Sequence, residues 1–183
     1  MKVLSIAPTR LSLFGGGTDT QPYCDQYGGI TLSMAISIRQ KMVLLTGDDT
    51  FHIGKSSFPF QGSPEFCYKI LSHYGLGSGH LSKVLSSFDG YLNAGLGSSA
   101  AAAVALIGAI NRTKGLGMST HGIAMAAWKL EVEEIGLFGG KQDQFAAAYG
   151  GVNVMSFKKE NVDVTPLARG LIEKIAECVF LFF

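Results

Sequence analysis

The chain has 183 residues, of which 47% are hydrophobic and 16% are charged, and its formal net charge is +1. This length and composition are typical of a globular domain with a sizeable core. The near-neutral charge, with no block of Lys or Arg, argues against a nucleic-acid-binding protein. The longest apolar run, Ala100–Ile110, is too short for a membrane span, and the first residues lack a signal-peptide pattern. Three widely spaced cysteines favour reduced thiols, so we expect a cytoplasmic protein without membrane contact.

Strands and helices are predicted in an order without strict alternation. Hydrophobic patterning predicts strands over 2–14, 29–38, 41–46, 151–157, 161–165 and 178–183, with a further short strand at 51–53. Helices are predicted over 65–74, 79–86, 98–113, 119–135, 142–148 and 170–177. The mixture predicts an α+β fold rather than a doubly wound sheet.

The stretch NAGLGSSAAAAVALIGAIN, residues 93–111, joins a glycine turn to an alanine-rich helix. The first N–H groups of a helix carry a partial positive charge, and glycines let an anion approach them closely. A phosphate-binding turn is therefore one interpretation, although the sequence is not a Walker loop. The alternative is an ordinary turn in which Ser98 or Ser99 caps the helix.

A second stretch, EVEEIGLFGGKQDQFAAAYGG, spans residues 131–151 and concentrates carboxylates in a chain that has few charges. Helical spacing places Glu131 on an apolar face, where it either binds a metal ion such as Mg²⁺ or makes a buried hydrogen bond. Asp143 follows a glycine-rich link. It either caps the short helix after it or accepts a proton from a substrate hydroxyl.

A third stretch, APTRLSLFGGGTDT, spans residues 7–20. Three consecutive glycines permit a close approach of the backbone to another group, and Thr18 and Asp19 then offer acceptors for a polyhydroxylated ligand. The alternative for Asp19 is an Asx-type turn after the first strand.

These three segments, in this order, resemble the GHMP kinase superfamily. Its phosphate-binding motif matches Gly95-Leu96-Gly97-Ser98-Ser99-Ala100, and its sugar-kinase branch matches Ala7-Pro8-x-Arg10 with Gly15-Gly16-Gly17-Thr18-Asp19. Gly140-Lys141-Gln142-Asp143-Gln144-Phe145 is most similar to the D-glycero-D-manno-heptose 7-phosphate kinases. The resemblance implies the N-terminal domain of that superfamily, similar to domain 2 of ribosomal protein S5, over residues 1–183. The C-terminal domain is expected to be absent.

The resemblance also implies roles for individual residues. Asp143 would orient or deprotonate the acceptor hydroxyl, Arg10 would stabilise phosphate charge near it, and Lys141 would add to that charge stabilisation. Residues of the glycine motif would bind ATP: Gly95, Leu96, Gly97, Ser98, Ser99 and Ala100. Ser99 and Glu131 would bind Mg²⁺. The sugar would contact Gly16, Gly17, Thr18 and Asp19.

The expected function is therefore phosphoryl transfer from ATP to a hydroxyl of a sugar or sugar phosphate, for example O1 of heptose 7-phosphate. The apolar end, Val-Phe-Leu-Phe-Phe, suggests a fragment, for which we expect weak turnover or none. One alternative is a nucleotide- or sugar-binding module without catalysis. Another is an interaction protein, and a homodimer is compatible with each of these functions.

Overall fold

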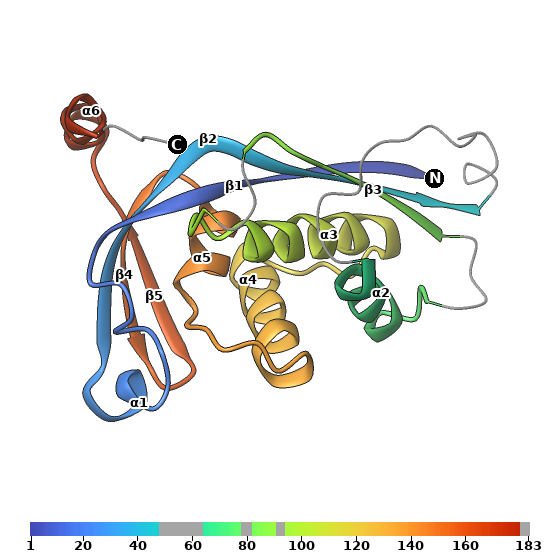
Figure 1. Cartoon of the computed structure of the whole chain (residues 1–183), viewed down its shortest axis with the longest axis horizontal. Helices are drawn as coiled ribbons and strands as arrows, with labels where there is room; N and C mark the ends of the chain where they lie inside the picture. Colours follow the sequence, from blue (N-terminus) through green and yellow to red (C-terminus); the bar gives the residue numbers. More distant parts are fainter. Residues whose placement is uncertain (48–63, 78–81, 91–93, 180–183) are drawn as a thin grey trace.

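The computed structural model of the chain describes residues 1–47, 64–77, 82–90 and 94–179. Five strands form one antiparallel sheet (Figure 1): β1 (Lys2–Phe14), β2 (Gly29–Thr46), β3 (Ser82–Phe88), β4 (Val152–Lys158) and β5 (Asn161–Pro166). The helices are α1 (Tyr23–Tyr27), α2 (Pro64–His73), α3 (Ser98–Lys114), α4 (Thr120–Lys129), α5 (Gln142–Tyr149) and α6 (Arg169–Cys178). A π-helical turn, η2 (Leu130–Glu134), extends α4. The predicted α+β class is confirmed.

Strand β2 organises the sheet because its two ends have different partners. Its first half pairs with β4 and its second half pairs with β3, while β1 runs antiparallel along nearly its whole length. Strand β5 pairs with β4 at the far edge. Helices α2, α3, α4 and α5 gather on one side of this sheet (Figure 1). The loop after β1, the start of α3 and the link from η2 to α5 lie on this helical side of the sheet.

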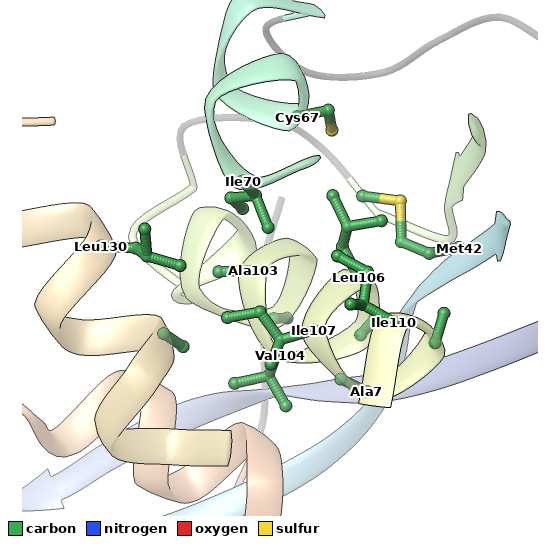
Figure 2. Packing of buried hydrophobic residues seen from close by; sticks show 14 of the residues in the cluster. Ala7, Met42, Cys67, Ile70, Ala103, Val104, Leu106, Ile107, Ile110 and Leu130 are labelled. Atoms are coloured by element: carbon green, nitrogen blue, oxygen red, sulfur yellow. The ribbon is translucent and has the colours of Figure 1, made fainter. Parts of the chain in front are cut away.

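Helix α3 is the centre of the main core (Figure 2). Its Leu106, Ile107 and Ile110 are fully buried and belong to one cluster with Ala7 of β1 and Met42 of β2. The small residues that the sequence places along α3 allow its backbone to lie close to the sheet. A Cβ at Gly108, for example, would lie 2.9 Å from the hydroxyl of Ser5 on β1. The helix predicted over 98–113 is therefore present, and it packs closely on the sheet.

The structure corrects the helix predicted over 79–86, because residues 82–88 form strand β3. Ser86 and Phe88 are both buried, and Val84 packs on the core cluster, so every second side chain faces inward. The buried position of Ser86 hid this alternation in the sequence. Its hydroxyl accepts a hydrogen bond of 2.7 Å from the amide of Gln40, which compensates for its burial.

Three other boundaries differ from the predictions. The strands predicted over 29–38 and 41–46 are one continuous strand, β2. The helix predicted over 119–135 is α-helical to Lys129 and π-helical beyond it. The strand predicted over 178–183 is wrong at its start, since α6 includes Cys178. Residues 180–183 and the strand predicted at 51–53 lie outside the described residues. No described helix is long and apolar enough to cross a membrane.

Lys141 is fully buried between α4, α5 and the turn that joins β4 to β5. Its ammonium lies 4.3 Å from the centroid of the Trp128 ring and donates a hydrogen bond of 2.7 Å to the carbonyl of Lys159. Cation–π contact and hydrogen bonding compensate for the burial of the charge, while the methylene stem fills core volume. Lys141 therefore joins the β4–β5 hairpin to the helical layer.

We predict that Lys141→Ala lowers the free energy of unfolding by about 2–4 kcal/mol, because it leaves a cavity where a long side chain is fully buried. Lys141→Met keeps most of the volume and also removes a buried charge, so its loss should be less than half as large. Urea unfolding followed by far-UV circular dichroism measures both variants. Equal losses in the two variants would contradict this account, since they would assign the stabilisation to the ammonium contacts.

Candidate functional site

A cavity of about 500 Å³ opens where the loops on the helical side of the sheet converge. Most of its lining is polar, and its residues come from β1, the following loop, the start of α3, η2, the link after η2 and α5. They are Arg10, Ser12, Gly16, Gly17, Asp19, Thr20, Ser99, Ala100, Glu131, Val132, Leu137, Phe138, Gly139, Gly140, Gln142, Asp143 and Gln144. The cavity thus unites the three segments selected from the sequence.

Arg10 and Asp143 form a two-pronged ion pair in this cavity. The Nε of Arg10 donates to Oδ1 of Asp143 at 2.7 Å, and its Nη2 donates to Oδ2 at 2.8 Å. The remaining Nη1 donates to the carbonyl of Gly95 at 2.7 Å, and the backbone N–H of Arg10 donates to the carbonyl of Leu96. Arg10 therefore fixes the carboxylate and the glycine turn relative to each other.

The Asp143 side chain is 30% exposed, so it remains accessible from the cavity despite its ion pair. Burial raises the pKa of its carboxyl above the ordinary value, Arg10 lowers it, and the negative charge of Asp19 raises it further. The helix-capping alternative for Asp143 is not what the structure shows, because both of its oxygens accept hydrogen bonds from Arg10. Asp143 is thus a positioned carboxylate whose affinity for protons is increased.

Glu131 lies on the π-helical turn and is only 3% exposed. Its Oε2 accepts a hydrogen bond of 2.6 Å from the amide of Gln144. Burial raises the pKa of its carboxyl, and hydrogen bonds from Gln144 and Ser99 lower it. The buried hydrogen bond proposed as the alternative to metal binding is therefore present. The separate hydrogen bond from Ser99 places Glu131 beside the start of α3.

Asp19 is nearly buried and connects the loop after β1 to the start of α5. Its Oδ2 accepts a hydrogen bond of 2.9 Å from the N–H of Gln142, and its Oδ1 accepts one from the N–H of Gly17. A side chain at Gly140 would overlap the carboxylate of Asp19, so this position requires glycine. The Asx-type turn expected as the alternative for Asp19 is not what the structure shows, because Gly17 precedes Asp19 and an Asx turn bonds a later N–H. Asp19 instead caps α5 from a distant segment.

The glycine turn leads into α3 with Gly97 as the N-cap residue, in the left-handed region at φ 72°. The prediction that Ser98 or Ser99 occupies the N-cap is wrong, because both lie inside the first helical turn. A Cβ at Gly97 would lie 3.0 Å from Oδ2 of Asp143. Glycine at this position therefore permits the turn and the carboxylate to approach each other.

Several predicted site residues do not line this cavity. The hydroxyl of Thr18 donates to the carbonyl of Gly15 and accepts from the N–H of Ile30, which stabilises the turn between β1 and β2. Lys141 points away from the cavity, toward Trp128 and Lys159, and so cannot stabilise phosphate charge from this position. Residues of the glycine motif that lie outside the lining are Gly95, Leu96, Gly97 and Ser98.

Sequence reasoning missed seven side chains of the cavity, which are Ser12, Thr20, Val132, Leu137, Phe138, Gln142 and Gln144. The amide of Gln142 donates to the hydroxyl of Ser12 at 2.9 Å, and Gln144 donates to Glu131. The two glutamines flank Asp143 at alternate positions, and this spacing was the available signal. Leu137 and Phe138 also line the cavity, and Phe138 is 90% exposed.

Comparison with known proteins identifies the family and the fold of the chain. The model of the GHMP kinases N terminal domain matches residues 65–151. A D-glycero-α-D-manno-heptose 7-phosphate kinase of Campylobacter jejuni is 32% identical in a 181-residue alignment. The alignment covers 87% of this chain and 52% of that protein. The chain therefore spans about half the length of this curated relative.

Solved structures show the same fold. A D-glycero-D-manno-heptose 1-phosphate kinase from Bacteroides thetaiotaomicron matches with a TM-score of 0.77 and 28% identity, covering 92% of this chain and 60% of that one. Lactococcus lactis galactokinase, in complex with galactose, matches with a TM-score of 0.66 and 18% identity over 91% of this chain and 47% of that one. At that identity the galactokinase shows the fold alone. The chain is a member of the GHMP kinase family and contains the N-terminal domain of that family.

Proposed function

We propose that this chain supplies the N-terminal part of an ATP-dependent kinase that phosphorylates a hydroxyl of a sugar or sugar phosphate. The observation that carries the proposal is the shared cavity. It places an accessible carboxylate, Asp143, next to a glycine turn at the start of a long helix and a second, buried carboxylate, Glu131. Phosphoryl transfer requires mainly the positioning of reactants and the neutralisation of charge, and this arrangement suits both requirements.

Asp143 is the proposed proton acceptor for the acceptor hydroxyl. The hydroxyl loses its proton to Asp143, its oxygen forms a bond to the γ-phosphorus of ATP, and the bond from that phosphorus to the β,γ-bridging oxygen breaks to release ADP. The ion pair with Arg10 fixes the carboxylate without hiding it. Asp19, with Gly16 and Gly17 beside it in the lining, would bind further hydroxyls of the acceptor.

The triphosphate would lie against the turn Gly95–Ser99 and the first N–H groups of α3, where a helix favours anions. Mg²⁺ fits the neighbouring residues, because Glu131 and Ser99 offer a carboxylate and a hydroxyl, and the buried Oε1 of Gln144 has no hydrogen-bond partner. The described residues hold no group of three His, Cys, Asp or Glu that could bind a metal. The ion would therefore take its other ligands from phosphate and water. It would supply neutralisation of the phosphate charge.

The acceptor we propose is heptose 7-phosphate, with O1 as the phosphorylated oxygen. Similarity to two heptose phosphate kinases, at 32% and 28% identity, supports a heptose rather than another sugar. ATP and this sugar phosphate are the proposed small-molecule partners. We also propose that the protein is cytoplasmic and can form a homodimer.

We predict that Asp143→Asn in the full-length protein lowers kcat at least about 100-fold, because an amide cannot accept the proton of the hydroxyl. The affinity for ATP, measured by calorimetry, should change by less than about threefold. The matched control is Asp163→Asn, an exposed aspartate on β5, which should retain full activity. Turnover in Asp143→Asn at the wild-type rate would contradict the role of Asp143. ATP binding by the wild type without transfer to any sugar phosphate would instead indicate a binding module.

The acid side of the pH–activity profile should depend on Arg10. Asp143 acts only when deprotonated, so kcat/KM falls as the pH drops through its pKa, which burial raises. Arg10 lowers that pKa, so Arg10→Met should move the acid limb to higher pH. Arg10→Lys keeps the positive charge and should move the limb less. An acid limb at the same pH in all three proteins would show that another group controls it.

Glu131→Gln should increase the Mg²⁺ concentration needed for half-maximal activity by about tenfold or more, because it removes the charge of a proposed ligand. Glu133→Gln provides the control, since Glu133 lies two residues away on the same turn but is exposed and outside the lining. A magnesium titration of the initial rate measures the effect. An unchanged magnesium requirement would remove Glu131 from the metal site.

A further inference from the structure

The link between η2 and α5, Gly136–Gly140, carries two exposed apolar side chains at the rim of a polar cavity. Leu137 is 45% exposed and Phe138 is 90% exposed, and both line the cavity. Phe138 provides the one aromatic ring among the described lining residues. Small-molecule pockets combine apolar and aromatic side chains with a few convergent polar groups, and these two residues supply the apolar part of this cavity.

Both ends of this link are fixed to residues of the site. At its start, the N–H of Leu137 donates to the carbonyl of Glu131 at 2.9 Å. At its end, Gly140 lies directly against the carboxylate of Asp19. The backbone that carries Phe138 is therefore anchored at both ends, beside the residue of the proposed metal-binding carboxylate and beside the proposed sugar-binding carboxylate.

The chemistry of a ring-form sugar matches this border. A pyranose has hydroxyl groups around its edge and a face of C–H groups that packs on aromatic rings, as other apolar groups do. The hydroxyls require the carboxylates and amides of the cavity floor, and the C–H face requires an apolar surface opposite to them. An open-chain polyol has no such face.

We propose that Phe138, supported by Leu137, is a specificity-determining residue that binds the C–H face of the acceptor sugar. The site thereby selects ring-form sugars over open-chain polyols. This inference rests on the proposed function, because it assigns a face of the acceptor in the same cavity. It requires no movement of the loop, only contact with a ring that the described residues leave open to solvent.

The first test measures binding without catalysis. Trp128 is the one tryptophan of the chain and is 2% exposed, so Phe138→Trp adds an exposed indole at the rim. In the full-length protein without nucleotide, D-glycero-D-manno-heptose 7-phosphate should shift the emission of this indole to shorter wavelength. The open-chain heptitol 7-phosphate should need at least about a threefold higher concentration for the same change. No shift with the heptose phosphate overturns the proposal.

The second test measures selectivity. Phe138→Ala should lower kcat/KM for heptose 7-phosphate about three- to tenfold, mainly through KM, and leave kcat/KM for heptitol 7-phosphate unchanged. Leu116→Ala serves as the control, because Leu116 is an exposed leucine between two glycines beyond α3, outside the cavity. Equal losses with both acceptors, or an equal rise in KM for ATP, overturn the proposal.

The two proposals fail in different ways. A fluorescence shift with the heptose phosphate in a protein that transfers no phosphate would contradict the kinase and support the role of Phe138. Phosphorylation of the heptose with no change in selectivity in Phe138→Ala would support the kinase and overturn the role of Phe138.

Discussion

The contact on which the site depends is the ion pair between Arg10 and Asp143. One guanidinium joins three segments that are far apart in sequence: β1 through its own backbone, α5 through Asp143, and the glycine turn through Gly95. Two parallel hydrogen bonds to one carboxylate fix its direction as well as its distance. Each group is partly removed from water, and the attraction between the two charges offsets part of the cost of that burial. The position of the glycine turn relative to the carboxylate therefore depends on one residue of the first strand.

That ion pair leaves the cavity strongly acidic. Among the charged residues of the lining, Asp19, Glu131 and Asp143 contribute −3 and Arg10 contributes +1, which gives −2 when all four are ionised. Such a cavity repels a triphosphate unless a cation accompanies it. The start of α3 offsets only part of this repulsion, since a helix end carries about half a charge. Simple charge balance therefore supports the joint binding of ATP and Mg²⁺ in our proposal, and it does so without reference to any relative.

Patterns that are local in sequence predicted the fold well. Strand β1 was predicted well because its side chains alternate, and helix α3 because a glycine precedes it, an apolar run forms its body and a glycine follows it. Strand β3 failed because a buried serine occupies a position where an apolar residue would reveal the alternation. Its partner, Gln40, is 46 residues away, and no local pattern contains that information.

Site residues were predictable by type but not always by contact. Asp19, Glu131 and Asp143 all reach the cavity, as expected for carboxylates beside glycine turns. Lys141 does not, although it lies two residues from Asp143. The direction of its side chain is decided by Trp128 and by a carbonyl of a distant hairpin. A lysine in a motif is therefore a weaker indication of a catalytic role than an aspartate or glutamate, since its long aliphatic stem can place the ammonium in the core.

The π-helical turn explains why the floor and the rim of the cavity differ in character. The N–H of Ile135 donates to the carbonyl of Leu130, five residues before it, and the N–H of Leu137 reaches Glu131, six residues before it. These bonds widen the helix where it ends, which is a known feature of functional sites. The backbone carbonyl of Glu131 helps to hold the rim, while its side chain faces Gln144 in the floor. Glu131 thus links the proposed metal site to the loop that carries Phe138. The charged floor and the apolar rim are therefore held at a fixed position relative to each other.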